Sequence, residues 1–401
     1  MLNIEIKGVQ FSNKGAELML VAILQQLDYE LGDYQITLSP GRLLPYEKRA
    51  KLGAWQKLSF RRGKIDLTGL LARLPIKVLD FLKRYGLVTE KSVDVILDSS
   101  GFAYGDQWGE KLLSYTENEV WRYKQNNKPY IFLPQAFGPF NQTKNRESAR
   151  GVFSNASLTF PRDEHSYRAV IDSIGLNQFP QIQQMPDFTC LIEPTPFKKY
   201  QNEYAKANAK SLCLIPNNKM ISKFHHDNAS EDTLSYVNFL VATGKYYRSL
   251  GWQVVLLNHE GIEDHQICLQ IQSELVGDNH KNAIEIIEGL SAIDIKAFIG
   301  SVDVVVSSRF HGCVSALTQG VPCLATTWSH KYQMLFNEYG LSENVLDFKM
   351  KEQVLFEKLS IFNREFERQK EQAKSHAEIV KQQTRNMWKQ VFSILKPINK
   401  T

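Results

Sequence analysis

The sequence lacks several features that would assign a chain of 401 residues to a function class at once. Its five cysteines are odd in number and include no Cys-x-x-Cys pair, so we expect free thiols in a reducing cytoplasm. No apolar run approaches the roughly 18–20 residues that span a bilayer. The N-terminal sequence MLNIEIKGVQF lacks the long apolar region and cleavage site of a signal peptide. We therefore expect a soluble, cytoplasmic protein.

The sequence also lacks a strong excess of charge of one sign and several common catalytic motifs. The net charge of +5 is mild and dispersed, which gives no reason to expect a nucleic-acid partner. The Gly-x-Ser-x-Gly and Walker motifs are absent, which argues against a serine hydrolase and a P-loop enzyme. His225, His226 and Asp227 are adjacent, but no second ligand pair stands at a known spacing, so we expect no metal.

What the sequence does contain is an alternation of short apolar strands and amphipathic helices, typical of parallel sheets covered by helices. The expected strands are 4–9, 93–97, 130–133, 158–160, 212–215, 254–257, 302–306 and 323–326. The length favours two domains. A polar, proline-containing stretch at 194–210 divides them, which predicts an N-terminal domain at 1–200 and a C-terminal domain at 205–357. A charged helical tail at 358–401 either caps the second domain or crosses back onto the first.

One segment interrupts this alternation. Residues 47–86 contain eleven lysines and arginines and three acids, and the part at 65–86 is amphipathic. Such a pattern suits contact with a membrane surface. It also suits an ordinary insertion with a solvated basic face and a buried apolar side, which we favour from the sequence alone.

The stretch SSRFHGCVSALTQGVP at 307–322 follows an apolar strand and opens a helical pattern. Ligands of open α/β sheets bind at the carboxyl ends of strands, where a following helix also offers free N–H groups. The guanidinium of Arg309 offers two parallel N–H donors suited to a carboxylate or a phosphate. His311 adds a group that titrates near neutrality, and Gly312 allows the backbone to approach a ligand closely. The pattern favours an anionic substrate that exchanges a proton. The alternative is a structural ion pair for Arg309 and a backbone-satisfied His311.

Other strand ends carry further candidates, each with a structural alternative such as a helix cap, a glycine turn or a local ion pair. Asn13 precedes the first helix, and Ser100 and Gly101 lie in the glycine-rich loop before Asp106. Arg162 offers a second anion clamp, and Lys331 adds positive charge downstream of His311. The candidate binding residues are Asn13, Ser100, Gly101, Gln135, Arg162, Arg309, Phe310, Gly312 and Lys331, and the candidate catalytic residues are His311 and Asp106.

Taken in order, several of these motifs resemble those of the polysaccharide pyruvyl transferase family. They are NKGAE, SSGFAYGD, PYIFLPQAFGPF, RDEHSYRAV, MPDFTC and SSRFHGCVSALTQGVPCLA. The resemblance implies an α/β fold of two Rossmann-like domains in a glycosyltransferase-B type arrangement, with the active site in the interdomain cleft. It also implies transfer of the enolpyruvyl group of phosphoenolpyruvate to a sugar hydroxyl of a surface-polysaccharide precursor, giving a pyruvate ketal without a cofactor.

By position, the resemblance makes His311 the proton donor, Arg309 and Arg162 the donor-binding arginines, and Asp106 the carboxylate of the glycine-rich loop. The acceptor would be a sugar, such as a lipid-linked oligosaccharide at the inner face of the membrane. The chain departs from the family where many members read Gly-Gly-Gly-Asn, because it has Ser-Ser-Gly-Phe at 99–102. Two alternatives stay open: a glycosyltransferase of the same fold that uses a nucleotide sugar, and a catalytically silent family member that binds a glycan.

Overall fold

The structure, a computed structural model, describes residues 1–62, 65–175, 179–194, 210–224, 233–276, 284–326 and 329–399. Two compact units divide the chain. The first comprises Met1–Phe11, Ala16–Leu191 and Gln382–Thr401, and the second comprises Ser12–Gly15 and Ile192–Lys381. The domain boundaries expected from the sequence stay a prediction, but the long C-terminal helix contributes to both units.

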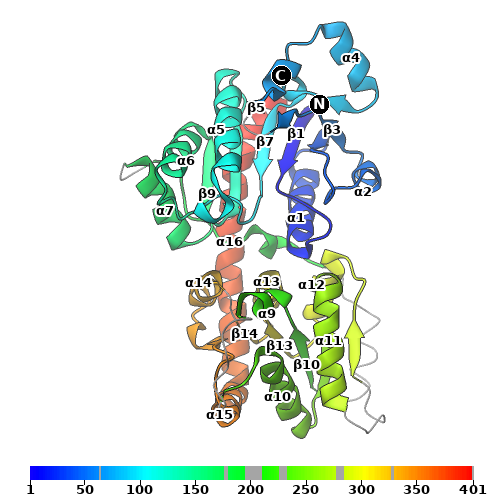
Figure 1. The fold of residues 1–401 in the computed structure, drawn as a ribbon, viewed down its shortest axis with the longest axis vertical. Coiled ribbons are helices and arrows are strands. Elements are labelled where there is room, and N and C mark those ends of the chain that lie inside the picture. The colour runs from blue at the N-terminus through cyan, green and yellow to red at the C-terminus, as the bar shows by residue number, and fades with distance from the viewer. Residues whose placement is uncertain are drawn as a thin grey trace. The chain divides into compact units, whose positions relative to one another are not determined.

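The first unit is built on a seven-stranded parallel sheet in the order β6-β3-β2-β1-β7-β8-β9. Helices α5, α6 and α7 cover one face and α1 lies on the other (Figure 1). The strands are β1 Leu2–Lys7, β2 Tyr34–Leu38, β3 Trp55–Lys57, β6 Leu87–Val88, β7 Val95–Asp98, β8 Tyr130–Gln135 and β9 Leu158–Pro161. The main helices are α1 Lys14–Glu30, α2 Tyr46–Lys51, α3 Thr68–Leu71, α4 Ile76–Arg84, α5 Glu110–Gln125, α6 Thr143–Asn155 and α7 Glu164–Ile174. A two-stranded ribbon, β4 Arg61–Arg62 and β5 Ile65–Asp66, stands apart from this sheet.

The second unit has a six-stranded parallel sheet in the order β12-β11-β10-β13-β14-β15. Its strands are β10 Ser211–Ile215, β11 Gln253–Leu257, β12 Glu285–Ile287, β13 Val304–Ser307, β14 Cys323–Thr326 and β15 Val345–Leu346. The helices are α9 Asn218–Phe224, α10 Tyr236–Ser249, α11 Gly261–Val276, α12 Ala292–Ile299, α13 Phe310–Leu317, α14 Lys331–Glu338 and α15 Glu352–Arg364. Helices α10, α11 and α15 share one apolar core with the central strands.

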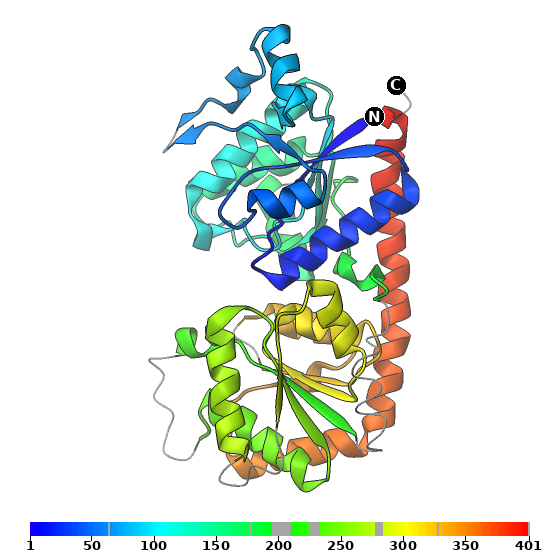
Figure 2. The same ribbon diagram turned by 90° about the vertical axis from the view of Figure 1, so that its right-hand side faces the viewer.

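All eight strands expected from the sequence are present, and the alternating pattern is confirmed. Helix α16, Phe366–Asn399, forms the C-terminal tail and is the long red helix of Figure 2. Its part from Gln382 belongs to the first unit, where Thr384 Oγ1 and Cys190 Sγ are 3.1 Å apart. All five cysteines are buried and free, as expected. No helix among the described residues is long and apolar enough to cross a membrane.

Both sheets have a point where the strand order reverses. In the first it lies between β1 and β7, which are sequence-distant neighbours, and in the second between β10 and β13. In open parallel sheets the loops that leave the carboxyl ends of such strands diverge and leave a crevice for ligands. These loops, after Lys7, Asp98, Ile215 and Ser307, are where each unit can bind a substrate.

A buried charge network joins two strands of the first sheet, β1 and β3, to α5. Lys57 Nζ donates to Glu5 and to Glu119, each at 2.6 Å, and Lys7 also donates to Glu119. Burial alone would raise the pKa of Glu119, but the charges of Lys57, Lys7 and Arg61 bring it well below its usual value. The network fixes β1 and its end, Lys7, beneath α5.

Replacing Lys57 by Met is expected to destabilise the first unit by about 3–5 kcal/mol, because it leaves two buried carboxylates without their shared cation. Chemical denaturation followed by fluorescence measures the loss. Lys111, exposed on α5, is the matched control, and Lys111→Met should stay within about 0.5 kcal/mol of the parent. Equal effects of the two substitutions would contradict a structural role for the network.

Candidate functional site

The turn between β13 and α13 is held by a set of buried hydrogen bonds centred on Ser308. Its carbonyl oxygen accepts from Tyr332 Oη at 2.6 Å and from Asn217 Nδ2 at 2.8 Å. Its hydroxyl accepts from Tyr236 Oη at 2.7 Å and shares a hydrogen bond with Thr326. Side chains that lie in or after two other strands, β10 and β14, therefore hold the residue before Arg309 in one place.

Arg309 lies at the N-cap of α13 and contacts two carboxylates. Its Nε donates to Asp264 Oδ2 at 2.8 Å, its Nη2 lies 2.6 Å from the same oxygen, and its Nη1 donates to Glu260. Asp264 is fully buried and also accepts from the backbone N–H of Asn218. The ion pair that sequence reasoning kept as an alternative is therefore present, and an anion would have to share or displace one of these carboxylates.

Glu260 is the carboxylate better suited to leave. Burial raises its pKa above the ordinary value, although the charge of Arg309 opposes the shift. Glu260 is also partly exposed, whereas Asp264 is not. A group that takes up a proton more readily than usual can release the guanidinium to an incoming anion at a smaller cost in free energy.

His259 is a site residue that the sequence analysis did not single out, although its loop was visible as a strand end. Its imidazole is buried after β11. Burial, with the charges of Arg309, His311 and Lys14, lowers its pKa well below the ordinary value, so the ring is neutral. Its Nδ1 is buried with no hydrogen-bond partner among the described residues. A neutral ring with an unpaired buried nitrogen near Arg309 has the capacity to form one more hydrogen bond.

His311 lies in the first turn of α13, and its ring packs against Gly15, which the second unit includes. A Cβ on Gly15 would overlap the imidazole, which explains the glycine at the start of α1. The ring of Phe310 meets that of His311 edge to face, with centroids 5.5 Å apart. Lys331 Nζ lies 5.0 Å from the centroid of the Phe310 ring. Phe310 therefore contacts both His311 and Lys331.

Packing within the turn explains why residue 312 is a glycine. A Cβ at this position would lie 2.6 Å from Ser307 Oγ. That hydroxyl donates to the carbonyl oxygen of Arg309 and accepts from its N–H, so it closes the turn. Asn13 immediately precedes α1, within the same short segment of the second unit as Gly15.

In the first unit, Ser100 and Gln135 meet at Asp98, the last residue of β7. Ser100 Oγ donates to Asp98 Oδ1 at 2.6 Å, and Gln135 Nε2 donates to the Asp98 carbonyl oxygen at 3.1 Å. The Gln135 amide oxygen is buried without a hydrogen-bond partner among the described residues. The carbonyl oxygen of Gly101 accepts from Ala136 N, which ties the two loops together. These residues form the polar rim of the first sheet beside its reversal point.

Asp106 has a structural set of partners. Its carboxylate accepts from Asn141 N at 2.7 Å and from Asn145 Nδ2 at 2.8 Å, with Gln142 N at 3.4 Å. These donors belong to the start of α6, so the carboxylate joins the glycine-rich loop to that helix. The structure does not bring Asp106 together with Ser100 or Gln135 through any hydrogen bond described.

Arg162 is buried at the end of β9 and pairs with Asp187, at 3.4 Å and 25 positions further along the chain. Asp163 instead caps α7 by accepting from Ser166 N. Asp187 also accepts from Thr189 Oγ1 and N. Arg162 is tied to the polar rim by its backbone, because its N–H donates to the Gln135 carbonyl oxygen.

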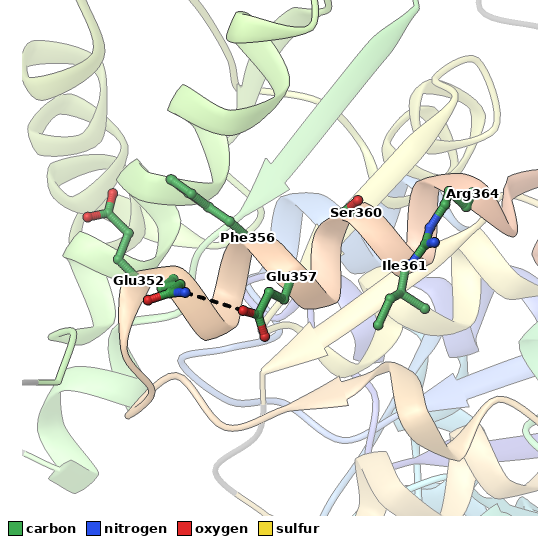
Figure 3. A pocket seen from close by; sticks show the side chains of 7 residues that line it. Glu352, Phe356, Glu357, Ser360, Ile361 and Arg364 are labelled. Carbon is green, nitrogen blue, oxygen red and sulfur yellow. Dashed lines mark hydrogen bonds between the residues drawn. The ribbon is translucent and has the colours of Figure 1, made fainter.

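The hollow drawn in Figure 3 fits a substrate less well. The seven side chains that line the one in Figure 3 all come from α15, with Phe356 and Arg364 among them. Ligand sites instead gather polar groups from several elements. No group of His, Cys, Asp and Glu suited to a metal occurs in the described part of the chain. His225, His226 and Asp227 lie outside the described residues.

The fold and these two polar rims define an α/β protein with two Rossmann-like units, the class shared by its structural relatives. UDP-GlcNAc 2-epimerase from Neisseria meningitidis, bound to UDP-GlcNAc, aligns over 96% of this chain and 99% of its own, with a TM-score of 0.57 and 12% identity. Anabaena HepE, in complex with UDP and glucose, aligns over 99% of each chain with a TM-score of 0.55 and 12% identity. At such identities the likeness concerns the fold alone. No curated protein matches the chain in sequence.

The sequence places the chain more narrowly. The profile of the family described as polysaccharide pyruvyl transferase matches residues 13–330. The match covers most of the chain and includes every candidate site residue except Lys331. The chain belongs to the polysaccharide pyruvyl transferase family, as the motifs suggested.

Proposed function

We propose that this protein transfers the enolpyruvyl group of phosphoenolpyruvate to a sugar hydroxyl of a surface-polysaccharide precursor and forms a pyruvate ketal. Family membership supports the reaction class. The observation that carries the proposal is the pinned turn after β13, which holds Arg309 and His311 two positions apart at the reversal point of the second sheet. Phosphoenolpyruvate, as the donor substrate, requires a site for its anionic groups and a group that gives a proton.

Phosphoenolpyruvate carries a carboxylate and a phosphate, and Arg309 at the start of α13 provides a fork and a helix N-terminus for one of them. His311 gives a proton to the methylene carbon, which leaves an oxocarbenium-like centre at the neighbouring carbon. A sugar hydroxyl adds to that carbon and loses its proton. Departure of the phosphate and addition of a second hydroxyl, which also loses its proton, complete the ketal.

The first unit supplies groups for the sugar in this proposal. The buried amide oxygen of Gln135 accepts from a hydroxyl, and the Ser100 hydroxyl, held by Asp98, offers a second polar contact. Arg162 contributes positive charge once Asp187 shares its guanidinium. Asp106 keeps the glycine-rich loop on α6, so its effect on the reaction would be one of positioning.

A nucleotide-sugar glycosyltransferase is the second candidate. It is favoured by one observation, that solved structures of this fold include complexes with UDP-GlcNAc and with UDP and glucose. Arg309 and the helix N-terminus would then hold a diphosphate. The two candidates differ in their donor, which a binding experiment separates.

Thermal-shift titration with phosphoenolpyruvate, beside a panel of UDP-sugars, tests the donor. A ligand at about 100 times its Kd stabilises the fold by about 2.7 kcal/mol. We expect stabilisation by phosphoenolpyruvate that Arg309→Lys largely removes, because lysine keeps the charge and loses the fork. Stabilisation by UDP-sugars alone would contradict the proposal and support the glycosyltransferase.

Replacing His311 by Ala is expected to lower turnover by about 10²–10⁴-fold, the usual worth of a general acid, while the thermal shift with phosphoenolpyruvate is retained. The readout is phosphate released in the presence of acceptor sugars. His165, exposed on α7, provides the control His165→Ala, which should change nothing. Near-normal turnover in His311→Ala would overturn its assignment as the acid.

Glu260→Gln is expected to tighten phosphoenolpyruvate binding by about tenfold, because it removes a charged competitor for Arg309. The raised pKa of Glu260 means that protonation frees the guanidinium as pH falls, so parent affinity should weaken as pH rises through that pKa. Isothermal titration across pH should show a flatter profile for Glu260→Gln than for the parent. Glu263→Gln, on the exposed side of α11, is the control, and equal profiles would refute competition.

A further inference from the structure

The basic segment of the first unit departs from the interpretation favoured by its sequence. An ordinary insertion would bury the apolar side of its helix, yet α4, Ile76–Arg84, buries only Leu79. Ile76, Val78 and Phe81 are 64%, 41% and 56% exposed, and Tyr85, which follows the helix, is 69% exposed. Figures 1 and 2 show α4 standing off the sheet of its unit. The helix therefore presents its apolar residues to solvent.

These residues form one continuous face. Val78, Phe81 and Tyr85 recur at intervals of three and four, so they lie along one side of the helix, and the rings of Phe81 and Tyr85 are 5.2 Å apart. We call this set the α4 face. Further exposed apolar residues lie near it in the sequence. Of the twenty-one exposed large hydrophobic residues in the described chain, ten fall within 43–85. Such clustering marks an interaction surface.

The charges around the α4 face indicate what covers it. Lys77 and Arg84 are seven positions apart and form a stripe that borders the face, while Lys83 lies over the ring of Trp55 on the other side. Asp80 is the one acid among the nine residues of the helix. A second copy of this chain would bring these cations against one another in a symmetric contact. An anionic surface would meet them with opposite charge.

We propose that the α4 face docks the first unit on an anionic lipid bilayer, with Phe81 and Tyr85 inserted at the level of the headgroups and Lys77 and Arg84 on the phosphates. A helix of this kind lies in the plane of the interface, and its binding combines apolar burial with attraction to anionic lipid. The helix is too short to span, in keeping with the absence of a membrane-crossing helix among the described residues. The inference does not depend on the proposed reaction.

Co-sedimentation of the full chain with vesicles tests the proposal, using phosphatidylcholine alone and phosphatidylcholine mixed with phosphatidylglycerol. We expect binding to the mixed vesicles and little to the neutral ones. Tyr85→Asp should weaken it at least about tenfold. Tyr29→Asp, on the similarly exposed Tyr29 of α1, is the matched control and should bind like the parent.

The charge arm uses Lys77→Glu with Arg84→Glu, against the control pair Lys245→Glu with Lys358→Glu, exposed in the second unit. At about fivefold per surface cation, loss of the two cations predicts a decrease of about 25-fold or more for the first pair only. Equal loss for both pairs, or binding that Tyr85→Asp leaves unchanged, would overturn the proposal. Concentration-dependent dimerisation abolished by Tyr85→Asp, without vesicle binding, would assign the face to a second copy.

Discussion

Parallel strand pairing is the constraint on which the candidate site depends. Because every strand of a sheet runs the same way, all carboxyl ends meet at one edge, and residues far apart in sequence become neighbours. In the second unit this edge collects Asn217, Glu260, Ser308 and Thr326 from loops after β10, β11, β13 and near β14. Arg309 follows β13, at the reversal of strand order between β10 and β13, where ligands of open parallel sheets commonly bind. The position of the site follows from topology, and its chemistry from the few side chains that topology places there.

Charged and neutral side chains at that edge determine its electrostatic properties. Arg309 is a partly buried cation held by Asp264 and Glu260, and the neighbouring His259 is kept neutral by burial and by nearby positive charge. A partly buried cation without such partners would be costly, so the two carboxylates stabilise Arg309 in this position. In the proposed function the same partners compete with the substrate, because an anion must interact with Arg309 better than Glu260 does.

The sequence predicted the framework well because strands buried on both faces read as apolar runs, and all eight expected strands occur. It missed seven strands of two to five residues, β2, β3, β4, β5, β6, β12 and β15, of which β6, β12 and β15 lie at the edges of their sheets. Arg309 and His311 were visible because they follow such a run directly. His259 was not singled out, since its importance comes from burial beside Arg309, and the partners of Arg162 and Asp106, Asp187 and Asn145, lie 25 and 39 positions away. Long-range pairing of this kind leaves no local signal.

Segment 47–86 shows the limit of periodicity in another way. An amphipathic pattern indicates that a helix has an apolar side. It does not indicate whether that side packs in the core of the protein or lies on its surface. In α1 the apolar side forms the core, with Leu20, Ile23 and Leu27 almost fully buried. In α4 a single leucine reaches the core, while apolar side chains of similar size stay in water. Leaving them there forgoes about 25 cal/mol for each Å² that could be buried. A second surface that restores this burial must also tolerate the bordering cations, and an anionic bilayer meets both conditions.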